Sequence, residues 1–212
     1  MSTHLGRTPA YDGYPGPVTP ASADAERVDR QELILEAVLS LMSRQGIAGV
    51  SMRAVAREAG VALGLLHYYF ADKTALIAAA LRRVEEQDLA IVALDPSLSP
   101  DRRLKAALRR VAEPEFLTTE YLALRLQLWA LAQMHEDFAQ INSAAQERYR
   151  SGLAALIRAA RPGLGRAECE RRAADIDVLQ NGLWLTALLG LDKASIRRSV
   201  ARTEEIAFGD ST

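Results

Sequence analysis

The chain of 212 residues contains one cysteine and three histidines, and its formal net charge is only -1. A single cysteine, Cys169, cannot form an intramolecular disulfide, which fits a reducing compartment. His4, His67 and His135 are far apart in sequence and match no zinc-binding spacing, so we expect no metal site and no cofactor. The nearly neutral charge excludes a polycation that coats nucleic acid by bulk electrostatics. Any affinity for DNA must therefore be local.

Long hydrophobic runs are also missing. The longest apolar stretch, from about Val178 to Leu191, is interrupted by Gln180 and Asn181 and is shorter than the roughly 20 residues that span a bilayer. The N-terminus lacks the pattern of a secretory signal. No nucleophile elbow, phosphate-binding loop or dinucleotide-binding glycine pattern occurs. We therefore expect a cytoplasmic protein that has no membrane partner and is not an enzyme.

The most informative segment is residues 51–73, SMRAVAREAGVALGLLHYYFADK. It predicts a helix, a glycine turn and a second short helix that ends in aromatic residues. Ser51 can cap the first helix, Gly60 allows the left-handed turn that ends it, and small Ala56 lets the helices approach closely. Cations flank the second helix where DNA phosphates would lie, at Arg53, Arg57 and Lys73. An ordinary helical hairpin fits the glycine spacing too, but the flanking cations favour a DNA-reading helix-turn-helix.

The rest of the chain divides around this segment. Residues 1–24 are rich in proline and glycine and predict a disordered arm. Beyond them apolar residues recur at steps of three or four, and no segment alternates as a β-strand does. We expect an all-α fold of about nine helices, with a helix-turn-helix domain in residues 25–72. A helical ligand-binding and dimerisation domain follows in residues 73–208, starting with a connecting helix over 73–92, and residues 209–212 form a tail.

Part of the chain resembles a known protein family. Residues from about 27 to 92 are similar to the DNA-binding domain of the TetR family of bacterial transcriptional regulators, because GVALGLLHYYFADKTALIAAAL follows a helix that carries RAVAREA. The segment from Gly64 to Ala80 and the later NGLWLTALL look most like the BetI-type regulators of that family. The resemblance implies a homodimer that binds double-stranded operator DNA and responds to a small-molecule effector.

We expect the DNA-binding surface to consist of Ser51, Arg53, Ala62, Leu63, Gly64, Leu65, His67, Tyr68, Tyr69, Lys73 and Thr74. In this set Tyr69 and Lys73 contact phosphates, while His67 and Tyr68 reach base edges or the groove. Three positions depart from the family pattern: Ala62 replaces the usual capping serine or threonine, and Leu63 and Leu65 stand where polar residues are common. Specificity then relies partly on groove shape.

Ligand-binding candidates come from the apolar helices of the second domain: Tyr121, Arg125, Trp129, Met134, Phe138, Tyr149, Asn181 and Trp184. Each aromatic residue alone is more often simple core. Arg125 lies in a helix that should be largely buried, so it either pairs with a carboxylate, such as Glu120 or one on a neighbouring helix, or binds an anionic ligand group. A polar amide such as Asn181 also needs a partner: a ligand, a neighbouring helix or the other subunit.

The last two helices predict a subunit contact, because their apolar surface is wider than one surface helix needs. The candidates are Leu179, Leu183, Ala187, Leu188, Ile196 and Val200. The sequence thus favours a ligand-responsive transcriptional regulator, most readily a repressor released from a pseudo-palindromic operator by its effector. The alternative is a helical small-molecule-binding or interaction protein with a degenerate helix-turn-helix, and the outer face of the second short helix distinguishes the two.

Overall fold

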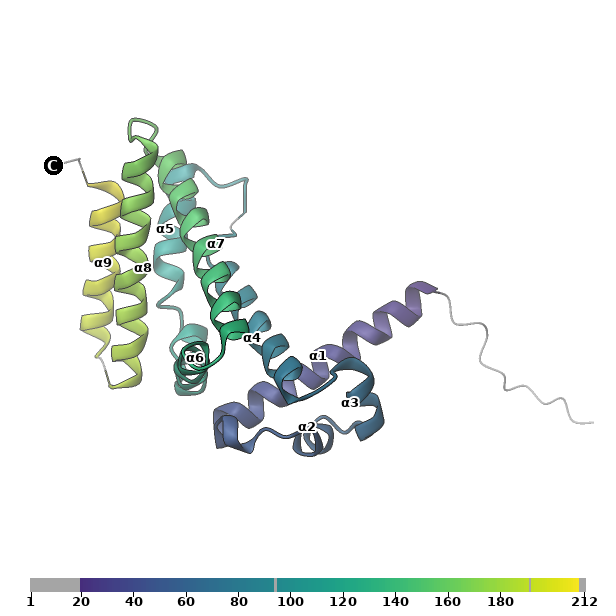
Figure 1. Ribbon diagram of the computed structural model, residues 1–212. Helices are drawn as coiled ribbons and strands as arrows, with labels where there is room; N and C mark the ends of the chain where they lie inside the picture. The colour runs from purple at the N-terminus through teal and green to yellow at the C-terminus, as the bar shows by residue number, and fades with distance from the viewer. Residues whose placement is uncertain (1–19, 94, 191, 210–212) are drawn as a thin grey trace, which may run out of the picture.

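The computed structural model describes residues 20–93, 95–190 and 192–209, and within them the chain is entirely helical (Figure 1). The elements are α1 (Pro20–Gln45), η1 (Ile47–Gly49), α2 (Met52–Glu58), α3 (Leu63–Tyr69), α4 (Lys73–Leu89), α5 (Pro100–Arg110), η2 (Pro114–Phe116), α6 (Thr119–Ala132), α7 (Glu136–Ala160), α8 (Arg166–Leu188) and α9 (Lys193–Phe208). The expectation of an all-α fold is confirmed. No helix in this part of the chain is long and apolar enough to cross a membrane.

The prediction of a disordered arm over residues 1–24 is wrong at its end, because α1 already begins at Pro20. Proline is well suited to the first turn of a helix, where its missing amide hydrogen would have had no partner. The remainder of the predicted arm, residues 1–19, lies outside the described residues, as do residues 210–212 of the predicted tail.

Helices α1, α2 and α3 form a compact unit at one end of the molecule (Figure 1). Its core contains side chains of α1 that are completely buried, such as Ile34 and Val38, together with Val55 of α2 and Leu66 of α3. The long helix α4 begins directly after this unit, capped by the Asp72 carboxylate, which accepts a hydrogen bond of 2.8 Å from the Ala75 amide. It then continues into the second domain.

In the second domain α4 packs against α7, while α7, α8 and α9 follow one another as neighbouring helices. Helices α8 and α9 form the side of the molecule away from α2 and α3 (Figure 1). Cys169 is buried in the core on α8. Helix α4 therefore connects the helix-turn-helix unit to the interior of the second domain in one continuous piece.

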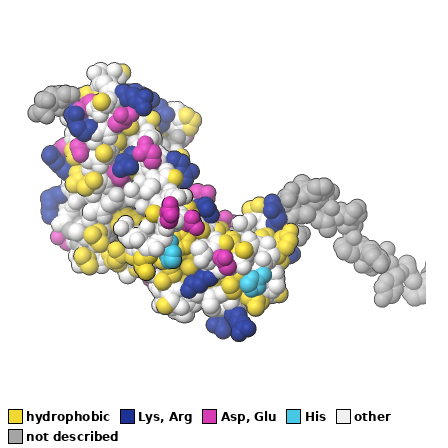
Figure 2. Space-filling model, in the orientation of Figure 1, with side chains coloured by type: hydrophobic (Ala, Val, Ile, Leu, Met, Phe, Trp, Pro, Cys, Tyr) yellow, Lys and Arg dark blue, Asp and Glu magenta, His cyan; other side chains and the backbone are white. Residues whose placement is uncertain are grey.

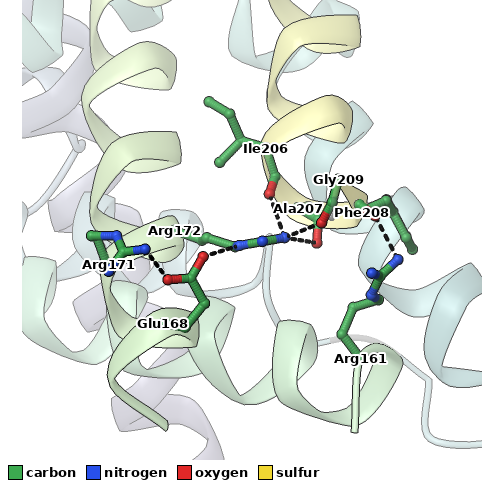
Figure 3. Close-up of polar contacts among 8 residues, drawn as sticks. All are labelled: Arg161, Glu168, Arg171, Arg172, Ile206, Ala207, Phe208 and Gly209. Atoms are coloured by element: carbon green, nitrogen blue, oxygen red, sulfur yellow. Dashed lines mark hydrogen bonds and ion pairs between the residues drawn. The ribbon is translucent and has the colours of Figure 1, made fainter. Parts of the chain in front are cut away.

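A buried arginine holds the C-terminal end of α9 against α8 (Figure 3). Arg172 is 6% exposed; its Nε donates to Glu168 Oε1 at 2.6 Å, and its Nη1 donates to the carbonyl oxygens of Gly209 at 2.7 Å and Ile206 at 3.0 Å. The last carbonyls of a helix have no partners within the helix and attract a positive charge. Arg172 therefore fixes the position of the last turn of α9.

Candidate DNA-binding surface and effector chamber

The turn between α2 and α3 is built as the sequence predicts. The Ser51 hydroxyl caps α2 by accepting a hydrogen bond from the Ala54 amide at 3.2 Å. Gly60 adopts a φ of 65°, a left-handed conformation that only glycine adopts easily, and the Val61 amide then donates to the Ala56 carbonyl at 2.9 Å. These contacts fix the angle at which α3 leaves α2.

The outer face of α3 is free of contacts with the rest of the described chain. Tyr68 is 76% exposed, His67 is exposed, and a side chain added at Gly64 would meet no atom within 4 Å. The inner face carries Leu66, which is completely buried. The helix thus projects an aromatic end outward while it stays anchored from behind, which is the arrangement needed to enter a DNA groove.

The other DNA-binding candidates surround this face. Ser51, Arg53, Ala62, Lys73 and Thr74 are exposed, whereas Leu63, Leu65 and Tyr69 are half-buried. The Tyr69 ring lies edge-on to the Tyr68 ring, 5.3 Å between centroids. Lys73 Nζ donates to the Ile47 carbonyl at 3.2 Å, so its charge is held at the side of α3.

Electrostatics leave this end of the molecule locally positive. The only anionic side chain of α2, Glu58, is paired with Arg44 of α1 at 2.6 Å. Arg53 and Arg57 form no ion pair with any residue that the structure describes. Figure 2 shows dark blue basic side chains on the lower surface around α2. Two unpaired guanidinium groups beside α3 are suited to bind DNA phosphates.

The second candidate site is a buried polar chamber between α4, α6, α7 and α8. Its walls are Glu85, Asp88, Leu89, Arg125, Ala145, Gln146, Tyr149, Asp177, Gln180, Asn181 and Trp184. The chamber encloses about 20 Å³, which is room for about one water molecule. Four of the lining side chains are acidic or basic and are buried: Glu85, Asp88, Arg125 and Asp177.

Arg125 of α6 pairs with Asp88 of α4 inside the chamber. This confirms the first of the two alternatives for Arg125, with the carboxylate on a neighbouring helix rather than at Glu120. Asp88 also accepts a hydrogen bond from the Tyr121 hydroxyl. Burial lowers the pKa of Arg125 to about 10, so the guanidinium stays protonated at neutral pH. The pair joins α4 to α6 across the interior.

Glu85 and Asp177 differ from Asp88, because neither forms an ion pair with a described residue. Loss of hydration on burial raises the pKa of both carboxyl groups, and the attraction of nearby arginines only partly offsets this effect. The Asp177 carboxylate accepts a hydrogen bond from the Asn181 amide at 3.0 Å, and the Tyr149 hydroxyl donates to Gln180 Oε1 at 2.7 Å. These contacts supply intrachain partners for the two amides of α8.

The predicted ligand-binding residues are only partly brought together. Arg125, Tyr149, Asn181 and Trp184 line the chamber, Tyr121 contacts its wall, and Trp129 lies behind Arg125. Two of the predicted residues lie outside this chamber. Met134 is 76% exposed after the end of α6, and Phe138 is buried beside the start of α4 in a different groove. Met134 and Phe138 lie one helical turn or more away from the residues of α6 and α7 that line the chamber.

Sequence reasoning missed the carboxyl groups of α4. Glu85 and Asp88 continue the buried stripe formed by Ile77, Leu81 and Val84, since they fall at the same helical spacing. Acidic residues on the apolar stripe of a helix are rare and need a partner or a function. That signal was present in the sequence and could have identified them.

The residues predicted for the subunit contact differ in their burial within one chain. Leu183 is 3% exposed and belongs to the core of its own chain, so its assignment to an interface is wrong. Leu179, Ala187, Leu188, Ile196 and Val200 are half-buried. The exposed apolar stripe of α8 consists instead of Val178, Gly182, Leu185 and Leu189, at steps of three or four residues. Residue 183 lies on the opposite side of the helix from this stripe.

Known proteins share both halves of this architecture. The family described as bacterial regulatory proteins, tetR family, matches residues 34–80, and the BetI-type transcriptional repressor C-terminal family matches residues 100–206. The HTH-type transcriptional regulator BetI of Rhizobium meliloti (strain 1021) is 30% identical over 178 residues, which cover 83% of this chain and 86% of that protein.

Solved structures of other regulators have the same fold. A transcriptional regulator from Pseudomonas aeruginosa PAO1 is 26% identical with a TM-score of 0.75, over 86% of this chain and 90% of that one. A regulator from Saccharomonospora viridis, solved in complex with choline, has the same fold at 22% identity and a TM-score of 0.68, over 86% and 97% of the two chains. By its matches at both ends, the chain belongs to the TetR family of bacterial regulatory proteins and is a ligand-responsive, DNA-binding transcriptional regulator with a BetI-type C-terminal half.

Proposed function

We propose that the protein is a homodimeric repressor that binds a pseudo-palindromic operator through α2 and α3 and leaves it when a small organic cation enters the chamber. The observation that supports operator binding best is the uncovered outer face of α3, flanked by Arg53 and Arg57, which form no ion pair in the part of the chain that the structure describes. Because the operator is chromosomal DNA, we expect the protein to act in the bacterial cytoplasm. The helix-turn-helix domain ends at Asp72, and the effector-binding and dimerisation domain follows it, with Lys73 and Thr74 at its start contributing to the DNA-binding surface.

The exposed stripe of α8 supports the dimer. Val178 and Leu189 are 70% and 78% exposed, and together with Leu185 and Gly182 they form an apolar surface without a cover in one chain. One short reading helix makes few base contacts, whereas two copies spaced by one helical turn of DNA, about 34 Å, double them. Pairing through α8 and α9 leaves both α3 helices free, because these elements lie on different sides of the molecule (Figure 1).

The charge of the chamber supports a cationic effector. Three carboxyl groups face a single guanidinium there, so the chamber carries a net charge of about -2 when all are ionised. Glu85 and Asp177 are buried without an ion-pair partner, which is unfavourable for the ionised forms until a cation arrives. Choline, the ligand of the Saccharomonospora viridis regulator, is the first compound to test.

Helix α4 supports the coupling between the two sites. It begins at Lys73, next to α3, and it carries Glu85 and Asp88 into the chamber. A ligand larger than water has to displace the chamber walls, and a displaced α4 changes the spacing of the two reading helices. The effector must prefer the spacing that does not fit DNA by about 1 to 3 kcal/mol.

The experiment is to select the operator from random duplex DNA with the purified full chain, then to titrate that duplex by fluorescence anisotropy. Lys73→Ala should weaken binding to all sequences alike and lower the slope of log affinity against log salt by about one, because one phosphate contact is lost. His67→Ala should change the preferred sequence instead. If neither variant alters operator binding, the assignment of α3 as the reading helix is refuted. Choline should release the wild-type protein from the duplex.

A further inference from the structure

Arg125 occupies a place that is built to receive a cation. Its guanidinium carbon lies over two tryptophan rings, 4.4 Å from the ring centroid of Trp184 on α8 and 5.0 Å from that of Trp129 on α6. The carboxylate of Asp88 contacts the same guanidinium. Facing aromatic rings with a nearby carboxylate are what proteins use to bind quaternary ammonium groups. We call Trp129, Trp184 and Asp88 the cation cage.

The arginine fits this cage incompletely. No acceptor within the described part of the chain faces the buried Nε of Arg125. Arg172 provides the internal comparison, because it is equally buried but donates to Glu168 and to the carbonyl groups at the end of α9 (Figure 3). An arginine that serves only to hold the fold can thus be well satisfied in this protein. Arg125 gives up hydration without gaining a full set of hydrogen bonds.

Two of the three cage residues, Trp184 and Asp88, are held by contacts that do not involve the arginine. The Trp184 indole Nε1 donates to the Val111 carbonyl at 2.9 Å, which fixes that ring. Asp88 is held separately by the Tyr121 hydroxyl. Both groups therefore remain in place as a site if Arg125 leaves.

The chamber beside the cage offers the Arg125 side chain an alternative position. The chamber beside it is too small for any ammonium ion that carries methyl groups, so such a ligand fits only if a large side chain moves. Glu85 and Asp177 border the same chamber and have no ion-pair partner among the described residues. Both already attract Arg125 across the chamber. If the Arg125 guanidinium rotates toward Glu85 and Asp177, it loses its contact with Asp88 and pairs with these two carboxylates instead.

We propose that Arg125 is a resident cation that fills the cage of the free protein, and that the effector binds by taking its place. This inference rests on the proposed cationic effector and adds how the effector acts. The Arg125–Asp88 pair joins α6 to α4, so the exchange breaks a buried ion pair between the two helices and allows α4 to shift against α7 and α1, its main packing partners. Ligand binding and release of α4 are then the same event.

The test measures binding of tetramethylammonium to the full chain, without DNA, by tryptophan fluorescence. Arg125→Met removes the competing charge and should tighten binding by about tenfold. Arg148→Met is the matched control, because Arg148 is exposed on α7 and also interacts electrostatically with Glu85 but does not enter the cage. Arg148→Met should change the affinity for tetramethylammonium less than threefold. The uncharged isostere 3,3-dimethylbutan-1-ol should bind more weakly than choline to the Arg125→Met protein.

Unchanged or weaker binding by Arg125→Met overturns the inference, and so does equal tightening by Arg148→Met, which would reveal only a bulk charge effect. If Arg125→Met does not fold, Asp88→Asn and the double variant Asp88→Asn with Arg125→Met allow the same comparison, since both charges of the pair are then absent. The double variant should bind more tightly than Asp88→Asn alone, and the opposite order overturns the inference. The proposed effector class fails separately, if wild-type protein stays on its operator at every choline and tetramethylammonium concentration while Arg125→Met still binds more tightly.

Discussion

Replacement of Arg172 by methionine should destabilise the protein far more than any other change at the α8–α9 contact. The side chain is 6% exposed, and its Nη1 donates to the carbonyl oxygens of Ile206 and Gly209. A hydrogen bond from a charged donor contributes about 1.5 to 3 kcal/mol. If only these two bonds are counted, at the lower value, the free energy of unfolding falls by about 3 kcal/mol. For a chain of this length that corresponds to a melting temperature about 6 to 12 °C lower.

Thermal unfolding followed by circular dichroism measures this loss, and Arg171→Met is the matched control. Arg171 contacts the same Glu168, but its side chain is 68% exposed, and exposed ion pairs contribute little. The two arginines thus share a partner and differ in burial and in the carbonyl contacts of α9. Equal melting temperatures for the two variants would refute the argument that Arg172 holds the last turn of α9.

Three further predictions concern function. Gly64→Ala should stabilise the fold by about 1 kcal/mol in urea unfolding, since alanine favours a helix and has open space here, yet it should weaken operator binding if DNA lies against this face. Leu185→Glu on the exposed stripe of α8 should yield monomers in analytical ultracentrifugation, whereas Val28→Glu, exposed on α1 in the other domain, should leave the dimer intact. Cation affinity, measured by calorimetry, should fall as the pH is lowered from 8 to 5, because burial raises the pKa of the two unpaired carboxyl groups of the chamber and their protonated forms do not attract a cation.

For each of these three predictions, one result would contradict it. Unchanged operator affinity of Gly64→Ala would mean that DNA does not approach that part of α3. A dimer that persists in Leu185→Glu would place the subunit contact elsewhere on the molecule. Cation affinity that is flat over the pH range, or higher at pH 5, would show that the carboxyl groups do not contribute to effector binding.

The sequence predicted what depends on short-range pattern. Ser51 and Gly60 each act within four residues of their position, so the two ends of α2 followed from residue type alone. The buried partner of Arg125 could be predicted only as a carboxylate on some neighbouring helix. Which one depends on how α4 and α6 cross, and that crossing is set by packing over the whole domain.

The differences between prediction and structure have the same cause, because they concern positions that are set by packing over the whole domain. Leu183 and Leu185 are both apolar residues of α8, and one sequence cannot indicate which side of the helix meets the chain's own core. Met134 and Phe138 have the composition of a pocket but lie past the end of α6, where the chain turns away. Pro20 illustrates the opposite case, in which a residue that breaks helices in their interior begins one.

The small size of the chamber has a kinetic consequence. With about 20 Å³ of free space, it has no room for an effector until the walls separate. Association that waits for such an opening is slower than the diffusion limit, and its rate levels off once the effector is abundant. At high effector concentration the opening of the chamber walls, and not the supply of effector, would then set how fast the protein leaves its operator.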